Sequence, residues 1–259
     1  MSTPTALLGA VRSELVKLWS LLSNRILAAV AVLIIAGSGG MLSMSTIARL
    51  TDPRFAGQRI EATPMMFVDG VLWAQIIVAI IAVLAVTGEY TSGQVRLSFL
   101  ALPTRLPWLG AKALVLAATG FAIGVVGSAI SLGISALALP GTDVRYDIEA
   151  SEAVMLSLGS GLYLAAIAAL AVGVTAVLRH VVAALVAVLV LLIVAPPLLA
   201  SVPGIGRVAD YLPTIAGRRL ISDFDSVAQL DPWAGYGVLL AWAACALLAA
   251  GVLLRARDA

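Results

Sequence analysis

The stretch AVMLSLGSGLYLAAIAALAVGVTAVL (153–178) is followed by Arg179, His180 and then VVAALVAVLVLLIVAPPLLA (181–200), and this region decides the fold. Neither apolar run contains an Asp, Glu, Lys or Arg residue. A helical run of about 20 apolar residues, rising about 1.5 Å per residue, crosses the hydrocarbon core of a bilayer. A single helix through both runs would exceed the bilayer thickness even when tilted. The region therefore predicts two membrane-spanning helices joined by a very tight turn at Arg179 and His180.

The composition of the whole chain agrees with a membrane protein. Of its 259 residues, 61% are hydrophobic and only 12% are charged, against about 25% charged residues in an average soluble domain. A soluble core of this size cannot bury so much apolar surface, whereas lipid can cover it. The chain has one cysteine, Cys245, and one histidine, His180, so the sequence predicts neither a disulfide framework nor a metal site. Its net charge of +2 is too small to indicate nucleic-acid binding.

Six stretches in all are long and apolar enough to cross a membrane. They lie at about 26–45, 70–88, 113–140, 153–178, 181–200 and 232–254, within a single domain covering residues 1–259. None of these stretches holds a charged residue, which disfavours an ion-coupled carrier or a channel lined by charged rings. The sequence thus predicts an all-α integral membrane protein with six transmembrane helices.

The placement of basic residues predicts the orientation of these spans. An even number of spans puts both termini on one side of the membrane, together with the second–third loop and the fourth–fifth turn. Basic residues beside span ends gather on that side: Arg25, Lys112, Arg179, Arg255 and Arg257. Since basic residues next to spans favour the cytoplasm, we expect cytoplasmic N- and C-termini.

Residues 7–25 predict an amphipathic helix that lies in the membrane interface before the first span. One face is apolar, with Leu8, Val11, Leu15, Leu18 and Leu22 at helical spacing. The opposite, polar face includes Lys17 and Asn24. The residues that we expect at the interface are Arg12, Glu14, Lys17 and Trp19. The alternative is a cytoplasmic extension of the first spanning helix.

The loop between the second and third spans, residues 89–112, is unusual in combining charge with apolar residues. Its charged residues are Glu89, Arg96, Arg105 and Lys112, and its apolar residues include Val95, Phe99 and Leu100. A merely solvated loop does not need such apolar residues. They indicate a short helix that docks into a groove of another protein. The alternative is a helix that folds back against its own bundle.

The segment Ala195–Gly217 is apolar but cannot form a straight helix. It contains several helix-breaking residues, namely Pro196, Pro197, Pro203, Pro213, Gly204, Gly206 and Gly217. We expect a re-entrant hairpin between spans five and six that dips into the outer leaflet, where protein or water must cover its irregular backbone.

Motifs for catalysis are absent from the sequence. It has no P-loop, no H-E-x-x-H and no G-x-S-x-G motif, so we expect no catalytic residues on this chain. Gly120 and Gly124 form a GxxxG spacing in the third span. In a helix so rich in Gly and Ala, chance spacing is favoured over a specific dimer face.

Three regions of the chain together resemble the ABC-2 type transporter permeases, especially the actinobacterial ones. In the loop after the second span, the resemblance is carried by GEYTSG (88–93), Arg96, ALPTR (101–105) and AKA (111–113). SELVKL (13–18) resembles the N-terminal interfacial helix of that family, and YLPTIAG (211–217) resembles its stretch before the last span. The resemblance covers nearly the whole chain, although no single motif is as specific as a P-loop.

This resemblance implies a transmembrane subunit that pairs with a second permease subunit, as a homodimer rather than a heterodimer, in lipid of the bacterial cytoplasmic membrane. Two separate ATP-binding-cassette subunits would bind ATP and Mg, with no cofactor on this chain. The loop would be a coupling helix whose partner-binding residues are Glu89, Tyr90, Gly93, Arg96, Phe99, Leu100, Pro103 and Arg105. The outer re-entrant segment would use Pro196, Pro197, Tyr211, Pro213 and Gly217.

The function implied by the resemblance is ATP-driven export of an amphiphilic or lipid-like substrate, such as a drug, peptide or lipid. The sequence does not identify the substrate-binding residues. The short turn at Arg179 and His180 departs from the family by leaving little room for a second large coupling helix. The alternative function is a non-transporting membrane module, such as an immunity, sensor or assembly subunit of an ABC-like complex.

Overall fold

The computed structural model describes residues 3–55, 57–91, 106–202, 204, 206–222 and 230–256 of the chain. The elements are, in order, α1 (Thr3–Ser20), α2 (Leu22–Arg49), η1 (Pro53–Phe55), η2 (Pro64–Val68), α3 (Val71–Thr91), α5 (Leu106–Ala138), α6 (Ala150–Leu178), α7 (Val181–Leu189), the π-helical turn η3 (Val190–Val194), α8 (Ala195–Ala200), α9 (Gly206–Ala209), α10 (Pro213–Arg218) and α11 (Pro232–Ala256). Within these ranges the chain is helical and forms no strand, apart from one isolated bridge that pairs Glu61 with Arg145.

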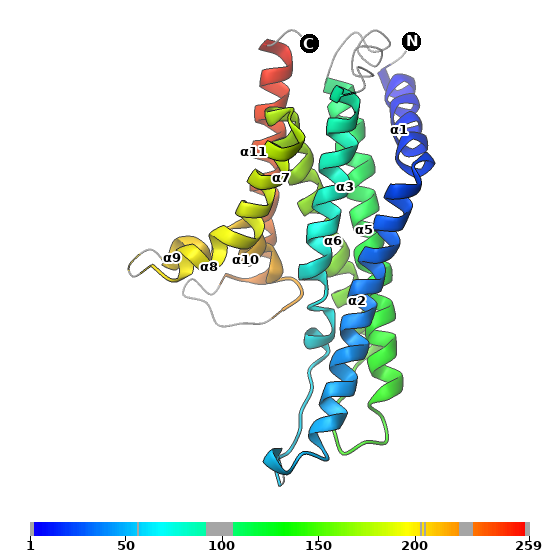
Figure 1. The fold of residues 1–259 in the computed structure, drawn as a ribbon, viewed down its shortest axis with the longest axis vertical. Helices are drawn as coiled ribbons and strands as arrows, with labels where there is room; N and C mark the ends of the chain where they lie inside the picture. The colour runs from blue at the N-terminus through cyan, green and yellow to red at the C-terminus, as the bar shows by residue number, and fades with distance from the viewer. Residues whose placement is uncertain are drawn as a thin grey trace.

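Six helices in the described part of the chain are long and apolar enough to cross a membrane. They are Leu22–Arg49, Pro64–Thr91, Leu106–Ala138, Ala150–Leu178, Val181–Ala200 and Pro232–Ala256. This confirms the expected all-α architecture and the number of candidate spans. Figure 1 shows an elongated bundle in which both chain ends lie at the same end, as an even number of crossings requires.

The two helix ends that flank the loop after the second span extend past the limits that the sequence predicts. α3 continues through Glu89 to Thr91, and α5 begins at Leu106 and includes Lys112. The prediction ended each span at its first charged residue, but Glu and Lys are good helix formers. The segment between these helices is therefore shorter than predicted, and comprises residues 92–105 instead of residues 89–112. Residues 92–105 lie outside the described ranges.

α5 and α6 pack closely in the centre of the bundle because glycines let their backbones approach. A Cβ atom on Gly124 would lie 2.5 Å from the Ser160 carbonyl oxygen and 2.7 Å from Gly161 Cα. A Cβ atom on Gly120 would lie 2.7 Å from the Leu164 carbonyl oxygen. The GxxxG spacing is thus needed for contact within the chain, which corrects its interpretation as chance spacing.

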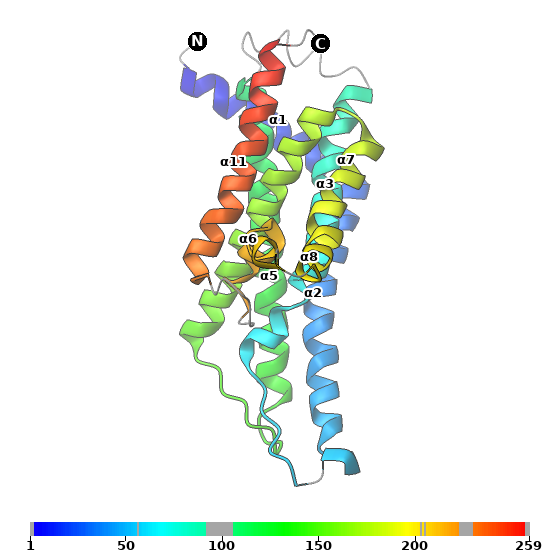
Figure 2. The same ribbon diagram turned by 90° about the vertical axis from the view of Figure 1, so that its left-hand side faces the viewer.

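α1 is a helix of its own and not a straight extension of α2. Leu21, with φ −83° and ψ 120°, interrupts the helical backbone between them. The break frees carbonyl groups at the end of α1, and side chains of α2 bind them: Asn24 Nδ2 donates to the Leu18 oxygen at 3.0 Å, and Arg25 Nε donates to the Trp19 oxygen. Figure 2 shows α1 running across the end of the bundle, away from the axis of α2.

The face of α1 that packs on the bundle combines charged and apolar side chains. Glu14, Leu18 and the nearby Asn24 of α2 are buried, whereas Leu8 and Leu15 are exposed. The sequence prediction places Lys17 and Asn24 on the face opposite the leucines but does not say which face packs on the bundle. Hydrophobic spacing does not identify the packed face of such a helix, because lipid accepts leucine as readily as a protein core does.

The segment after α7 leaves the bundle as α8 and α9 and returns through α10 to α11 (Figure 1). The carbonyl of Leu192 has no backbone donor in the helix, because both Pro196 and Pro197, four and five residues on, lack an N–H group. Thr214 Oγ1 of α10 donates to this oxygen at 2.8 Å. Where water is absent, this hydrogen bond from Thr214 replaces the backbone hydrogen bond that the Leu192 carbonyl lacks. It therefore holds α10 against the bent helix.

Replacing Thr214 with valine is expected to destabilise the protein by about 1–2 kcal/mol, because it leaves the Leu192 carbonyl without a donor. Thr214→Ser keeps the hydroxyl and is the matched control, with stability expected near that of the wild type. Reversible unfolding in mixed detergent micelles measures both. Equal stability of the valine and serine variants would show that this bond does not hold the segment.

Candidate functional site

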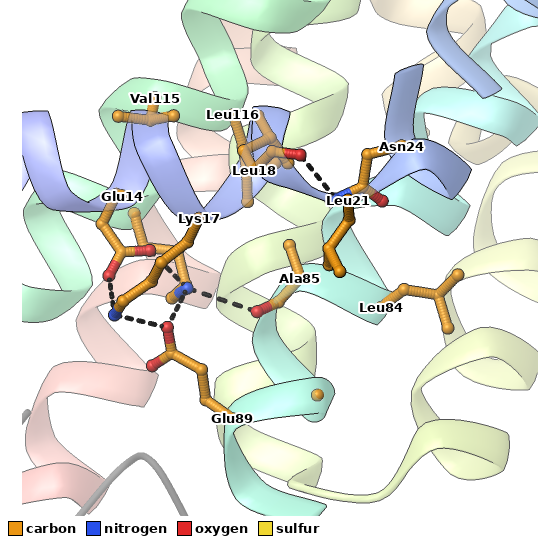
Figure 3. A pocket seen from close by; sticks show the side chains of 12 residues that line it. Glu14, Lys17, Leu18, Leu21, Asn24, Leu84, Ala85, Glu89, Val115 and Leu116 are labelled. Carbon is orange, nitrogen blue, oxygen red and sulfur yellow. Dashed lines mark hydrogen bonds and ion pairs between the residues drawn. The ribbon is translucent and has the colours of Figure 1, made fainter. Parts of the chain in front are cut away.

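Four charged residues from three helices meet at the end of the bundle that carries the chain termini. Glu14 and Lys17 come from α1, Glu89 from the last turns of α3, and Lys112 from the second turn of α5. We call these four residues the charge quartet. Figure 3 shows Glu14 and Lys17 pointing from α1 toward Glu89 on α3.

Lys112 is the centre of the charge quartet and is only 3% exposed. Its Nζ atom donates to Glu14 Oε2 at 2.6 Å, to Glu89 Oε1 at 3.0 Å and to the Ala85 carbonyl oxygen at 3.2 Å. An ammonium group has three N–H donors, so these three bonds satisfy it completely. Such pairing is what allows a charge to be buried.

Lys17 bridges the same two carboxylates from the more open side, where its side chain is 36% exposed. Its Nζ atom lies 2.8 Å from Glu14 Oε1 and 2.9 Å from Glu89 Oε1. Burial alone would lower the pKa of Lys17, but its hydrogen bonds to Glu14 and Glu89 and the charges of these carboxylates raise it above the ordinary lysine value. Because the pKa is raised, these ion pairs contribute fully at neutral pH and are lost only as the pH rises past the lysine range.

Aromatic side chains extend the charge quartet toward the turn between α6 and α7. Trp108 Nε1 donates to Glu89 Oε2 at 2.8 Å, and Lys112 Nζ lies 5.5 Å from the centre of the Trp108 ring. The Tyr90 ring packs edge-on against Trp108, with centroids 6.2 Å apart. On the other side, Arg179 Cζ lies 5.6 Å from the Tyr90 centroid. One connected set of contacts thus joins α1, α3, α5 and the α6–α7 turn.

A cavity of about 260 Å³ opens beside the charge quartet, between α1, α2, α3 and α5. The four charged residues line one part of it, and its apolar walls are Leu18, Leu21, Leu84, Val115 and Leu116. Figure 3 shows these side chains around the opening. The cavity therefore leaves space into which α1 could move.

The charge quartet is a set of side chains that pair with one another. Its carboxylates already accept hydrogen bonds from lysines and from Trp108, so neither is positioned as a general base. In the described ranges, no group of three or more His, Cys, Asp or Glu residues is placed to hold a metal ion. What the quartet does is tie α1 to the two helix ends that flank residues 92–105.

The structure describes only part of the site that the sequence predicts. Glu89 and Tyr90 lie in α3, where Glu89 is buried and faces the bundle. Six predicted partner-binding residues lie outside the described ranges: Gly93, Arg96, Phe99, Leu100, Pro103 and Arg105. On α1, Arg12 and Trp19 are exposed, whereas Glu14 belongs to the charge quartet.

The predicted outer residues lie together on the segment α8–α10. Pro196 and Pro197 lie in α8, Pro213 and Gly217 in α10, and Tyr211 just before α10. The Tyr211 carbonyl accepts a hydrogen bond from Trp242 Nε1 of α11 at 2.9 Å. A Cβ atom on Gly217 would lie 2.5 Å from Leu239 and 2.9 Å from Tyr163, so glycine allows α10 to pack closely.

The sequence analysis does not predict the charge quartet, although the positions of its four residues in the sequence indicate that they could pair. Charges are rare in this chain, and Glu89 and Lys112 each lie one residue beyond a predicted span. Glu14 and Lys17 are three residues apart, which places them on one side of a helix. These features together point to a paired set of charges near the end of the bundle.

Comparison of the sequence with protein-family models finds no match, and comparison with curated proteins finds none either. Support for a function therefore comes from the motifs and the geometry of the chain.

Proposed function

We propose that this protein is the transmembrane subunit of an ATP-binding-cassette exporter that moves an amphiphilic or lipid-like substrate out of the cytoplasm or inner leaflet. A separate subunit hydrolyses ATP, and residues 92–105 form the element that docks on it. The observation that carries the proposal is the charge quartet, which fastens α1 to the ends of α3 and α5 on either side of this segment.

The geometry supports transmission of force from the segment to the bundle. α3 ends at Thr91 and α5 begins at Leu106, so a displacement of residues 92–105 acts on both helix ends at once. Through Lys112 and Glu89 the same displacement acts on Glu14 and Lys17 of α1. Closure of two ATPase subunits would thus move three helices of each permease subunit together and switch the bundle from inward- to outward-facing.

The segments that resemble ABC-2 permeases also support the proposal. GEYTSG (88–93) contains Glu89 of the charge quartet, and AKA (111–113) contains Lys112. SELVKL (13–18) contains Glu14 and Lys17. The four residues that the fold brings together thus come from the segments on which the resemblance rests.

Reversing one charge in the docking segment tests the proposal. We expect Arg96→Glu to weaken association with the ATPase at least tenfold, about 1.4 kcal/mol, because the loss of a paired interface charge commonly costs more than this. Arg59→Glu is the matched control, because Arg59 is exposed in the loop between α2 and η2. The measurement is recovery of vanadate-sensitive ATPase activity with the affinity-purified protein.

Retention of full ATPase association and activity by Arg96→Glu would contradict the docking assignment. An ATPase complex that responds to none of a series of amphiphiles in proteoliposomes would favour the non-transporting module instead. Stimulation of ATP hydrolysis by one class of amphiphile would identify both the transport activity and its substrate class.

A further inference from the structure

Arg179 has a backbone conformation that is costly for its residue type. Its φ is +54°, and among the described residues it is the one non-glycine residue with a positive φ. It ends α6, where its N–H group donates to the Thr175 carbonyl at 2.8 Å. A glycine adopts this left-handed conformation without steric cost and commonly ends helices in this way. An arginine at such a position points to a role for its side chain.

The side chain of Arg179 reaches the end of α3. Its guanidinium carbon lies 5.6 Å from the centre of the Tyr90 ring, within the range of a cation–π contact. Tyr90 follows Glu89 of the charge quartet and lies one residue before the end of α3. The contact therefore connects the α6–α7 turn to the helix end that leads into residues 92–105.

From this turn, α7 leads to the outer segment. The span Val181–Ala200 is the least buried of the six, with 22% of the residues in its apolar stretch buried, against 67% for α6. Few contacts with the bundle therefore resist a tilt of α7. η3 and α8 continue this span directly from the end of α7, and the Leu192 carbonyl of η3 accepts a hydrogen bond from Thr214 of α10. A displacement at Arg179 thus has a continuous route to α8 and α10.

We infer that Arg179 is a positioning residue that passes movement of residues 92–105 through Tyr90 to α7 and on to the outer segment α8–α10. The inference rests on the proposed function, because it needs an ATPase to move the docking segment. It adds a second route to the one through the charge quartet, which acts on α1, α3 and α5. The Arg179 contact brings α7 and the outer segment into the same movement.

A spin label on α8, in the outer segment that this route reaches, and a second label on α5 test the inference. Cys245→Ser removes the single cysteine, and Leu137→Cys on α5 with Leu198→Cys on α8 supplies two exposed labelling sites. Pulsed electron resonance measures the distance between the labels in the complete complex, without nucleotide and with ATP and vanadate. We expect nucleotide to change this distance when Arg179 is present. We expect Arg179→Gly to lower the population of the new distance about fivefold, as loss of a cation–π contact implies.

Two further observations separate coupling from a structural role. The unfolding temperature of Arg179→Gly is expected to equal or exceed that of the parent, because glycine relieves the positive φ. Arg179→Lys keeps a cation and the backbone cost, and is expected to retain part of the distance change. A normal distance change in Arg179→Gly would overturn this inference but not the proposed function. Loss of the distance change together with a fall in the unfolding temperature of the variant would also overturn only this inference. No change with nucleotide in the parent would overturn the proposed function as well.

Discussion

Replacement of Lys112 by methionine is expected to destabilise the protein by about 3–5 kcal/mol, the largest loss from any single substitution in the charge quartet. Lys112 is 3% exposed and bonded to both carboxylates, so its removal leaves Glu14 and Glu89 with Lys17 as their one remaining cation in the quartet. Two buried negative charges then face each other across α1 and α3. Unfolding in mixed micelles, measured by circular dichroism, gives the free energy directly.

Two variants control for the loss of packing at Lys112. Lys17→Met also removes a cation, but the side chain of Lys17 is 36% exposed and water can compensate, so we expect a smaller loss. The double variant Glu14→Gln with Lys112→Met removes one charge of each sign and is expected to recover part of the stability. If the double variant is no more stable than Lys112→Met alone, the ion pairs are not the cause of the loss.

The second large effect is expected for Gly124→Ala. Its new Cβ atom would lie 2.5 Å from the Ser160 carbonyl oxygen and 2.7 Å from Gly161, and these are backbone atoms that no rotamer change can move away. α5 and α6 must then separate along the core of the bundle, at a cost of about 2–3 kcal/mol. The same unfolding measurement tests this value.

Gly133→Ala is the matched control, because it makes the same substitution in the same helix. A Cβ atom on Gly133 meets nothing within 4 Å. Alanine is a better helix former than glycine, so this variant is expected to gain up to about 1 kcal/mol. Similar effects of the two substitutions would show that the close approach of α5 and α6 is not what limits stability.

The fold was largely predictable because the signals for it are local. A span is recognised by its length and lack of charge, and the two residues Arg179 and His180 were sufficient to divide a long apolar run into two helices. The structure confirms this division, with α6 ending at Leu178 and α7 beginning at Val181. The positions of the helix ends were predicted less accurately, because composition does not show whether a charged residue at the end of a span will be paired.

The charge quartet was not predictable because its contacts join distant parts of the chain. Glu14 and Lys112 are 98 residues apart, and Lys17 and Glu89 are 72 apart. A single sequence contains no information on which of these charges pair. The sequence also did not show which face of α1 packs on the bundle, since its apolar face could pack on protein or on lipid. The docking residues between Gly93 and Arg105 lie outside the described ranges, so their role stays a prediction.

The balance of charges in the quartet has a consequence for the electrical behaviour of the protein. Its two carboxylates and two ammonium groups sum to zero. Moving one elementary charge through a potential of about 100 mV involves about 2.3 kcal/mol. A rearrangement that carries all four side chains together moves no net charge through the field, so membrane voltage neither drives nor opposes it. A rearrangement that separated Lys112 from its partners would make the same movement sensitive to voltage.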